Sequence, residues 1–398
     1  MNTGHGSDDR GDAVPERIAI FLTDLTGGGA ERAMVNLAAG MADRGLQVDL
    51  VLASATGPYL REVDDRVDVV DLAAGRTARA VLPLVTYLRR TRPDVLLSTL
   101  HHACIAATVA HALARTPTRL FLREANMVSE RPASAFDLRS RAQRRMMRWA
   151  YGRADGAIAV SEGVADDLRQ VFGVFDDKLW TLYNPVVSDD VQTLASHEPD
   201  HAWLAGGGPP VVVGVGRLVE QKDFGTLIDA FARVRAGRDA HLILLGEGPE
   251  RGALERRARE RGVAADVALP GFVANPFAYL ARAAVYVLSS RYEGLPGTLI
   301  QAMACGCPVV ATDCRSGPAE VLDRGRFGEL VPIGDDAAMA AAIERALDAP
   351  TPSDALRCRA GAFATGPVVS AYVRAFAGVR LEPLVEASST RTPGVDPR

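Results

Sequence analysis

The stretch AVYVLSSRYEGLPGTLIQAMACGCPVVATD, residues 284–313, decides the fold class. It contains a short apolar run, a loop with glycines and a proline, a helix-length segment and a second apolar run. Two buried strands joined by a helix predict a βαβ unit, whose strands lie parallel in one sheet. The same alternation recurs along most of the chain, and this pattern predicts parallel sheets that helices cover on both faces.

The alternation stops once, over residues 184–210, where proline, glycine, aspartate and serine are frequent, and then it restarts. At ~150 residues per domain, a chain of 398 residues should form two or three domains. We therefore predict an α/β protein with two Rossmann-like, doubly wound domains. The predicted segments are a disordered tail (1–16), an N-terminal domain (17–187), a linker (188–209), a C-terminal domain (210–367), a last helix (368–380) after a break at Gly366–Pro367, and a second disordered tail (381–398).

Bulk composition excludes several classes of protein. A net charge of −4 gives no reason to expect nucleic acid as a partner. The polar start of the chain lacks the apolar core of a signal peptide, and no apolar run approaches the ~20 residues that span a bilayer. The five cysteines form no disulfide framework. Three of them cluster, at Cys305, Cys307 and Cys314, but they lack the second ligand pair of a zinc site, so we expect buried thiols and no metal. From the composition as a whole we expect a cytoplasmic location.

The loop TDLTGGGAER follows the first strand and opens the first helix. Gly27, Gly28 and Gly29 allow backbone N–H groups to approach an anion at a helix N-terminus. Arg32 stands where the dinucleotide fingerprint G-x-G-x-x-G requires its third glycine, which counts against a nicotinamide site. A tight turn without a ligand remains the alternative.

Cations and glycines follow the strands of the second half. Arg217 and Lys222 lie after the run VVVGVG. A guanidinium and an ammonium at this place suit a diphosphate. The alternative is that both are ordinary solvated cations. The loops around Gly246–Pro249 and Leu269–Val273 supply one edge of a nucleobase slot or simply pack the core. Glu293 stands on a loop with Gly294 and Gly297, where a carboxylate accepts hydrogen bonds from vicinal sugar hydroxyls while N–H groups face phosphate.

Several segments together resemble a known family. GGGAER, AVSEGVADDL, YNPV, VGRLVEQKDF, LGEGPER, LPGF, SSRYEGLPGTLIQAMACGCPVVATDCRSGPAEVL and GELVPIGD occur in the order found in bacterial retaining glycosyltransferases of family four, which have the GT-B fold. The resemblance covers residues 17–379 and is most specific in the C-terminal part. It implies two domains across a cleft, a nucleotide-sugar donor bound by the second domain, and a last helix that crosses back to the first.

The resemblance assigns roles to matching positions. Arg217 and Lys222 would bind the donor diphosphate and offset the charge of the leaving group. Glu293 matches the first acid of the family's Glu-x7-Glu motif and would hold hydroxyls of the donor sugar. The Gly27–Gly29 loop would close over the diphosphate from the other domain. The implied donor-binding positions also include Gly216, Gly246, Glu247, Gly271, Phe272, Gly294, Leu295, Pro296, Gly297 and Thr298.

Two positions depart from the family pattern. Gln301 replaces the second acid of the motif, which holds the nucleotide ribose, so charge is lost there although an amide can still bind a hydroxyl. The family often carries a histidine after the fourth strand, where this chain has Thr99 followed by His101 and His102. We take these histidines, with Arg123, as candidate contacts for the acceptor or the sugar. Two ordinary loop histidines are the alternative.

The implied reaction is transfer of a hexose-like unit, with retention, from a UDP- or GDP-linked donor to a glycan or lipid-linked acceptor in surface polysaccharide or glycoconjugate synthesis. The chain has no Asp-x-Asp motif, so cations would replace a metal, and the nucleotide sugar is a substrate rather than a cofactor. A nucleotide-sugar epimerase and a donor-binding but inactive subunit, which Gln301 favours, are the alternatives.

The segment RSRAQRRMMRWAYGR, residues 139–153, predicts a basic amphipathic helix. Arg141, Arg144, Arg145 and Arg148 share one face, and Ala142, Met146, Trp149 and Ala150 share the other. We expect the face with Met146 and Trp149 to pack into the domain. The arginine face is either an ordinary solvated surface or a peripheral contact with the inner face of the cell membrane.

Overall fold

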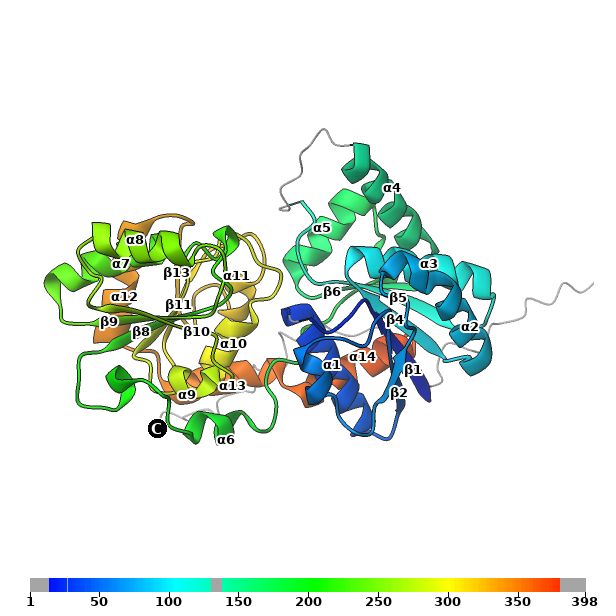
Figure 1. Cartoon of the computed structure of the whole chain (residues 1–398), viewed down its shortest axis with the longest axis horizontal. Coiled ribbons are helices and arrows are strands. Elements are labelled where there is room, and N and C mark those ends of the chain that lie inside the picture. The colour runs from blue at the N-terminus through cyan, green and yellow to red at the C-terminus, as the bar shows by residue number, and fades with distance from the viewer. Residues whose placement is uncertain (1–13, 27, 130–137, 380–398) are drawn as a thin grey trace, which may run out of the picture.

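The computed structural model describes residues 14–26, 28–129 and 138–379. They form two α/β domains joined by a short segment (Figure 1). The two predicted disordered tails lie outside the described residues, apart from residues 14–16 of the first. No helix in the described part of the chain is long and apolar enough to span a membrane.

The N-terminal domain contains a seven-stranded parallel sheet in the order β3-β2-β1-β4-β5-β6-β7. Its core strands are buried at nearly every position, which explains their continuous apolar runs. The strands are β1 (Arg17–Leu22), β2 (Gln47–Leu52), β3 (Asp68–Asp71), β4 (Val95–Thr99), β5 (Arg119–Glu124), β6 (Gly156–Ala159) and β7 (Leu179–Thr181). The helices are α1 (Gly29–Ala42), α2 (Val81–Thr91), α3 (His101–Ala114), α4 (Leu138–Arg153) and α5 (Glu162–Phe172).

The C-terminal domain repeats this architecture with a six-stranded parallel sheet in the order β10-β9-β8-β11-β12-β13. The strands are β8 (Val211–Val215), β9 (His241–Leu245), β10 (Val267–Gly271), β11 (Val285–Leu288), β12 (Val309–Thr312) and β13 (Glu329–Val331). The helices are α7 (Phe224–Gly237), α8 (Arg251–Glu260), α9 (Pro276–Leu280), α10 (Gly297–Ala304), α11 (Pro318–Val321), α12 (Asp336–Asp348) and α13 (Ser353–Ala360). The prediction of two doubly wound domains is confirmed.

The segment predicted as a linker contains a short helix, α6 (Val191–Ser196). Its last carbonyls bind the C-terminal domain, because the side chains of Asn275 and Arg282 donate to the carbonyls of Leu194 and Ala195 at 2.8 and 3.3 Å. Gln192 also donates to the carbonyl of Ala304 at 3.1 Å. The first half of the linker is therefore attached to the C-terminal domain.

The last helix, α14 (Thr365–Phe376), returns to the N-terminal domain, as Figure 1 shows in red-orange. A Cβ on Gly40 of α1 would lie 2.6 Å from the Thr365 side chain, so the two helices pack closely. The crossing predicted from the resemblance is confirmed. The predicted break at Gly366–Pro367 is wrong, because α14 starts before it. A proline fits the first helical turn, where its missing N–H has no partner to lose.

The packing predicted for α4 is also wrong. The residues buried against the domain are Met147, Ala150, Tyr151 and Ala154, whereas Met146 and Trp149 remain 44% and 42% exposed. The apolar positions of this helix form a band wider than the buried face, so the sequence pattern alone did not select the right side.

Candidate active site

The candidate site lies where the strand order of the C-terminal sheet reverses. β8 and β11 are neighbours at its centre, and the chain continues from β8 to β9 and β10 on one side and from β11 to β12 and β13 on the other. The loops that follow β8 and β11 therefore diverge and leave a crevice at their carboxyl ends. The predicted cations follow β8, and the predicted acid follows β11.

The structure brings Lys222 and Glu293 together at this crevice. Lys222 Nζ lies 2.5 Å from Glu293 Oε1, and the Ser290 hydroxyl donates to the same oxygen at 2.7 Å. Glu293 is 7% exposed, so its charge needs these partners. Both donors bind Oε1, so they fix the orientation of the carboxylate. Its second oxygen, Oε2, takes no part in the pair.

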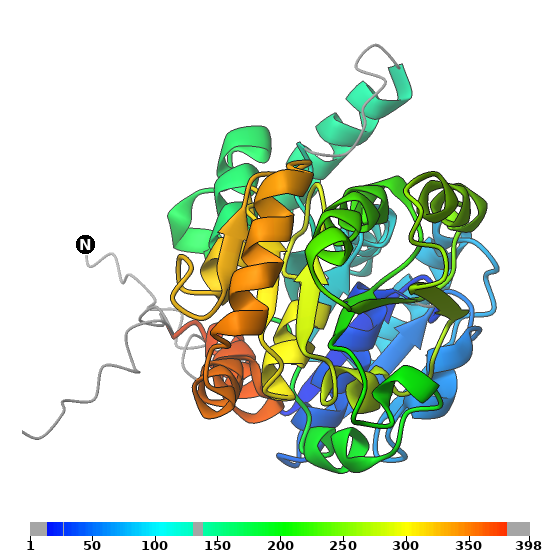
Figure 2. The ribbon, with the colours of Figure 1, turned by 90° about the vertical axis from the view of Figure 1, so that its left-hand side faces the viewer.

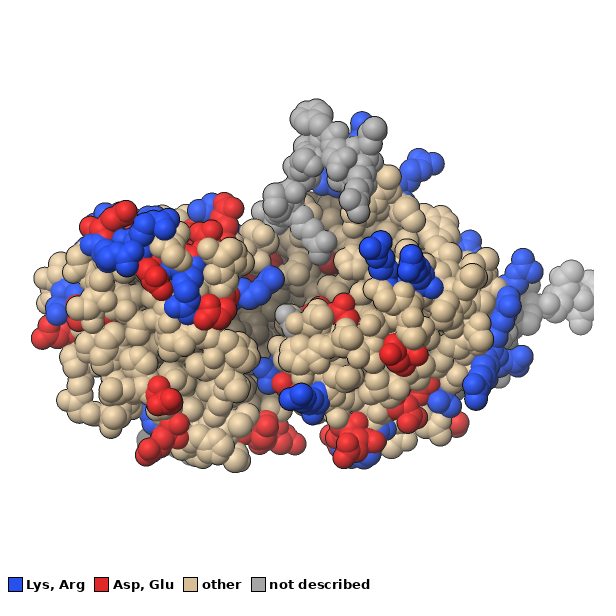
Figure 3. Space-filling view, in the orientation of Figure 1, with Lys and Arg blue, Asp and Glu red and all other residues tan. Residues whose placement is uncertain are grey.

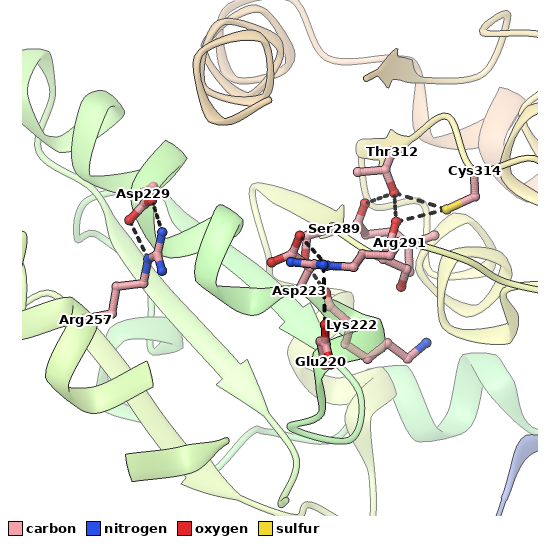
Figure 4. Close-up of polar contacts among 11 residues, drawn as sticks. Glu220, Lys222, Asp223, Asp229, Arg257, Ser289, Arg291, Thr312 and Cys314 are labelled. Atoms are coloured by element: carbon pink, nitrogen blue, oxygen red, sulfur yellow. Dashed lines mark hydrogen bonds and ion pairs between the residues drawn. The ribbon is translucent and has the colours of Figure 1, made fainter. Parts of the chain in front are cut away.

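The loops after β8 and β11 are joined by further hydrogen bonds (Figure 4). The Ser289 hydroxyl donates to the Lys222 carbonyl at 2.7 Å, and the Arg291 N–H donates to the Gln221 carbonyl at 2.8 Å. The Arg291 guanidinium also donates to Asp223 at 3.2 Å. These bonds hold the backbone on which Lys222 and the carboxylate loop stand.

The loop after β12 supports the same carboxylate loop from its other side. Thr312 Oγ1 and Cys314 Sγ donate to the Ser290 carbonyl at 2.6 and 2.9 Å. Burial raises the pKa of the Cys314 thiol to about 11, so the thiol keeps the proton that it donates. Ser316 Oγ donates to the Gly294 carbonyl at 2.9 Å. Three strand ends thus position the predicted acid.

The N-terminal domain reaches this loop directly. A Cβ on Gly294 would lie 2.0 Å from the Ala125 carbonyl oxygen just after β5, so only glycine fits this approach. The hydroxyls of Ser161 and Ser316 also share a hydrogen bond of 2.8 Å between the domains. Figure 3 shows that the surface is hollowed between the two domains.

The predicted diphosphate positions lie at the same strand ends. Arg217 follows β8 and is exposed, and the structure records no hydrogen bond from its guanidinium to the described residues. A Cβ on Gly216 would lie 3.2 Å from Lys222 Cε, so the lysine stem packs over this glycine. Gly246 has φ +139°, and a Cβ there would lie 1.9 Å from the Gly216 carbonyl oxygen. Glycine at position 246 is therefore required by the close approach of the loops after β8 and β9.

The predicted nucleobase edge combines a charged and an aromatic side chain. Arg251 donates to Glu247 at 2.7 Å and lowers the pKa of that carboxyl. A Cβ on Gly271, which has φ +97°, would lie 2.7 Å from Glu247 Oε1. Phe272, directly after β10, is 78% exposed, so its ring does not pack the core. The core-packing alternative is therefore wrong for this ring.

The start of α10 lies immediately after the carboxylate loop. Leu295 is buried, Pro296 precedes the first helical residue Gly297, and Thr298 Oγ1 is 2.7 Å from the hydroxyl of Tyr286. Gln301 lies one turn further along and is partly exposed.

The glycine-rich loop of the N-terminal domain is described only in part, because Gly27 lies outside the described residues. Gly28 precedes α1 in extended conformation, and Gly29 is the first residue of the helix. No atom lies within 4 Å of a Cβ placed on Gly29. A Cβ on Gly28, by contrast, would lie 2.5 Å from Glu31 Oε2, so a carboxylate from the first helical turn stands beside the start of α1.

The histidine candidates differ in their surroundings. His101 begins α3 and is buried, with Nε2 2.7 Å from Glu124 Oε2 at the end of β5. His102 is exposed. Because Glu124 precedes Ala125, which touches Gly294, the His101–Glu124 pair stands on the segment that faces the carboxylate loop.

Arg123 has a different place from the one expected. It is fully buried, and its guanidinium donates to Thr99 Oγ1 at 2.9 Å, to the Tyr372 hydroxyl at 3.1 Å and to Asn184. These partners belong to β4, to α14 and to the start of the segment between the domains. This arrangement supports a role for Arg123 in attaching the crossing helix rather than in contacting an acceptor.

Sequence reasoning missed Ser290, Ser316 and Glu124. Ser290 lies two residues after the end of β11, and Ser316 lies four residues after the end of β12. A position just beyond a buried strand is the signal that the sequence offered for both serines. Within the described residues no three His, Cys, Asp or Glu side chains group as metal ligands. The cysteines are free thiols, of which Cys358 is exposed and the other four are buried.

Comparisons with known proteins agree on one family. The family model "Glycosyltransferase Family 4" matches residues 27–190, and "Glycosyl transferases group 1" matches residues 209–349. LpsE of Rhizobium meliloti, a lipopolysaccharide core biosynthesis glycosyltransferase, is 30% identical over 324 residues, which cover 80% of this chain and 85% of LpsE. N-acetylgalactosamine-N,N'-diacetylbacillosaminyl-diphospho-undecaprenol 4-alpha-N-acetylgalactosaminyltransferase of Campylobacter jejuni is 31% identical over 198 residues, which cover 50% of this chain and 52% of that protein.

Solved structures show the same fold. HepE of Anabaena in complex with UDP has a TM-score of 0.75 at 20% identity, over 91% of this chain and 100% of that chain. The lipopolysaccharide outer core galactosyltransferase WaaB, in its apo form, has a TM-score of 0.69 at 20% identity, over 90% of this chain and 98% of that chain.

Proposed function

This chain belongs to the bacterial glycosyltransferases that combine a group 1 domain with a family 4 domain, and we propose that it transfers a sugar from a nucleotide-sugar donor with retention of anomeric configuration. The proposed donor is UDP- or GDP-linked. The proposed acceptor is a glycan or a lipid-linked sugar used in surface polysaccharide or glycoconjugate synthesis.

The observation that carries this proposal is the pair of Lys222 and Glu293 at the strand-order reversal. Glu293 Oε2 is the atom that we assign to the donor-sugar hydroxyls, because Oε1 already receives Lys222 and Ser290. Lys222 then stands between the sugar-binding carboxylate and the diphosphate. Arg217, on the same loop, adds a forked donor for the phosphate oxygens.

The proposed reaction needs no covalent intermediate with the protein. The bond between the anomeric carbon and the phosphate oxygen breaks, and the acceptor oxygen bonds to the carbon on the face that the phosphate leaves. The acceptor proton passes to the departing phosphate oxygen. Lys222 and Arg217 offset the negative charge that develops on the diphosphate, which is the kind of interaction that lowers a barrier most.

We propose that these two cations replace a divalent metal. The sequence contains no Asp-x-Asp motif of the kind that would bridge a metal to a diphosphate. Transfer should then continue in the presence of EDTA and gain little from added magnesium or manganese. A strict requirement for either metal would contradict this part of the proposal.

The donor base and the acceptor class are supported by the relatives. HepE was solved with UDP, and the name of the Campylobacter enzyme specifies a diphospho-undecaprenol acceptor. The exposed ring of Phe272 beside Gly271 offers a stacking surface for a base in the present chain. We propose a cytoplasmic reaction with an acceptor of this lipid-linked kind or its glycan part.

A panel of nucleotide sugars tests the proposal. A bound donor should raise the melting temperature, because a ligand that binds the native state stabilises it. Release of nucleoside diphosphate with an acceptor should follow, and NMR of the product should show the anomeric configuration of the donor. Binding without release would support a donor-binding subunit instead. Conversion of the donor sugar to its epimer without use of acceptor would support an epimerase.

A further inference from the structure

Helix α4 presents a group of arginines that the proposed reaction does not use. We call Arg141, Arg144, Arg145 and Arg148 the basic face of α4, and all four are exposed. Met146 and Trp149 adjoin this face and are 44% and 42% exposed. The helix therefore places cations and large apolar side chains together on one solvent-facing surface.

The attachment of α4 to its domain does not depend on these exposed residues. Met147, Ala150, Tyr151 and Ala154 form the buried side, and the Tyr151 ring lies 5.2 Å from the Phe172 ring of α5. Figures 1 and 2 show α4 at the outside of the N-terminal domain, with one end projecting beyond it. The helix thus stands at the periphery of the molecule.

The charged residues of α4 are all basic. The sequence of Leu138–Arg153 contains six arginines and no acid, in a chain whose net charge is −4. The basic face has no ion pair recorded within the described residues, and Arg148 donates only to the Val171 carbonyl, at 2.9 Å. On α8, by contrast, Arg251 and Arg257 are neutralised by Glu247 and Asp229. Figure 4 shows the pair of Arg257 and Asp229. The charge of the basic face is therefore available to an external anion.

We propose that the basic face of α4 docks the protein on an anionic lipid bilayer, with Trp149 and Met146 at the level of the headgroups. Arginines attract an anionic membrane surface, and a tryptophan side chain favours the boundary between headgroups and acyl chains. A soluble polyanion would use the arginines but gives no reason for an exposed Met146 beside them. The association is reversible, because a single interfacial helix binds far more weakly than a spanning one.

Flotation with unilamellar vesicles tests the docking. The full chain should float with vesicles of phosphatidylcholine and phosphatidylglycerol but not with phosphatidylcholine alone, and added salt should release it. Each arginine near an anionic surface contributes roughly fivefold to the partition coefficient. The double variant Arg144→Glu, Arg145→Glu should therefore bind at least ~30-fold more weakly. The assay needs neither donor nor acceptor, so its outcome is independent of the proposed transfer reaction.

The matched control reverses two exposed arginines on α8, Arg256→Glu and Arg259→Glu, which changes the net charge equally. This variant should bind vesicles as the wild type does. Circular dichroism should show that all variants fold, and Arg141→Gln provides a milder change with the same readout. A blue shift of tryptophan fluorescence on anionic vesicles should disappear in Trp149→Phe.

Four results would overturn the proposal. The first is that the wild type fails to float with anionic vesicles at low salt. The second is that the α4 double variant floats as well as the wild type, and the third is that the α8 control loses binding as much as the α4 double variant does. The fourth is binding of a short single-stranded RNA through Arg144 and Arg145 without any binding to vesicles, which would assign the basic face to a soluble polyanion.

Discussion

Lys222 and Glu293 are 71 positions apart in the sequence, and their side chains meet at 2.5 Å across the reversal of the C-terminal sheet. In the proposed reaction the carboxylate binds the donor sugar and the ammonium binds its diphosphate, and one hydrogen bond joins the two groups. A change at either residue should therefore leave the other side chain without its charged partner and shift the position of the donor.

Lys222 should not be replaceable by arginine. The chain has only two lysines, Lys178 and Lys222, among 45 basic residues, so a lysine at this position stands out in an arginine-rich chain. Its stem packs over Gly216, and its compact ammonium meets Glu293 Oε1 as a point charge, which a planar guanidinium does not reproduce. We expect Lys222→Arg to lower the kcat of nucleoside diphosphate release by ~10-fold to ~100-fold.

Lys178→Arg serves as the control for this prediction, since among the described residues Lys178 donates only to the Ala154 carbonyl, at 3.3 Å. The scarcity of lysine also allows a chemical test. Reductive methylation of amines should inactivate the protein, and a bound donor should protect Lys222 from modification as measured by mass spectrometry. Full activity of Lys222→Arg, or inactivation without modification of Lys222, would remove the ammonium from the mechanism.

Gly294→Ala should separate the two domains at the site. The added Cβ meets the Ala125 carbonyl oxygen at 2.0 Å, so either the carboxylate loop or the N-terminal domain must move. A displacement near 1 Å at a reacting centre costs ~100-fold in rate, and we expect a loss of transfer of this size. Donor binding to the C-terminal domain should change much less, as measured by titration.

The control for Gly294→Ala is Gly361→Ala, because no atom lies within 4 Å of a Cβ at position 361 and its φ is −57°. This variant should retain wild-type transfer. Wild-type transfer by Gly294→Ala would show that the contact between the domains is not required for the reaction.

Phe272→Ala should weaken donor binding without destabilising the fold. The ring is 78% exposed, so its removal leaves no cavity, whereas stacking on a base contributes ~1–3 kcal/mol. We expect the Kd of the donor to rise ~5-fold to ~100-fold in calorimetric titration. Phe175→Ala is a matched control, because that ring is also 78% exposed but lies in the N-terminal domain. Equal donor affinity in both variants would contradict a stacking role for Phe272.

Glu320 should make stability depend on pH. Burial raises its pKa to about 7, although the Glu162 N–H donates to Oε2 at 2.9 Å from the other domain. The folded protein then holds a proton on Glu320 that the unfolded chain releases above its ordinary pKa of 4.5. The stabilising contribution is therefore fully present below pH 4.5 and is lost as the pH rises to about 7.

Melting temperatures measured from pH 4 to 8 check this sign. Glu320→Gln should lose the decline that this group causes and should be relatively more stable than the wild type above pH 7. The exposed Glu344→Gln should keep the wild-type profile. A wild-type melting temperature that rises between pH 5 and 7 relative to Glu320→Gln would contradict the assignment.

The sequence allowed the order of elements and the loops of the site to be predicted, because each strand, loop and helix is encoded locally. The partners of buried polar groups are not encoded this way. Arg123 finds Asn184 and Tyr372 at separations of 61 and 249 residues, and nothing local distinguishes it from a solvent-facing arginine. Ser290 is only three residues from Glu293, yet its hydrogen bond to Glu293 depends on the conformation of their loop. The surrounding strand ends impose that conformation.

The face of α4 shows a second limit of sequence patterns. Met146 and Met147 are adjacent and equally apolar, so periodicity did not decide which one the domain buries. The buried side depends on the position of Phe172 on α5, which Tyr151 contacts. Packing between α4 and α5 therefore determines which side of α4 is buried, which the sequence pattern did not specify.

The central claim is that Glu293 holds the donor sugar at the reacting centre. The most direct measurement is the kcat of sugar transfer by Glu293→Gln, which keeps the shape of the side chain but loses the charge that pairs with Lys222. We predict a loss of at least ~100-fold with binding of the nucleoside diphosphate retained, and no loss in Glu344→Gln. Transfer by Glu293→Gln within a few-fold of the wild type would contradict the account.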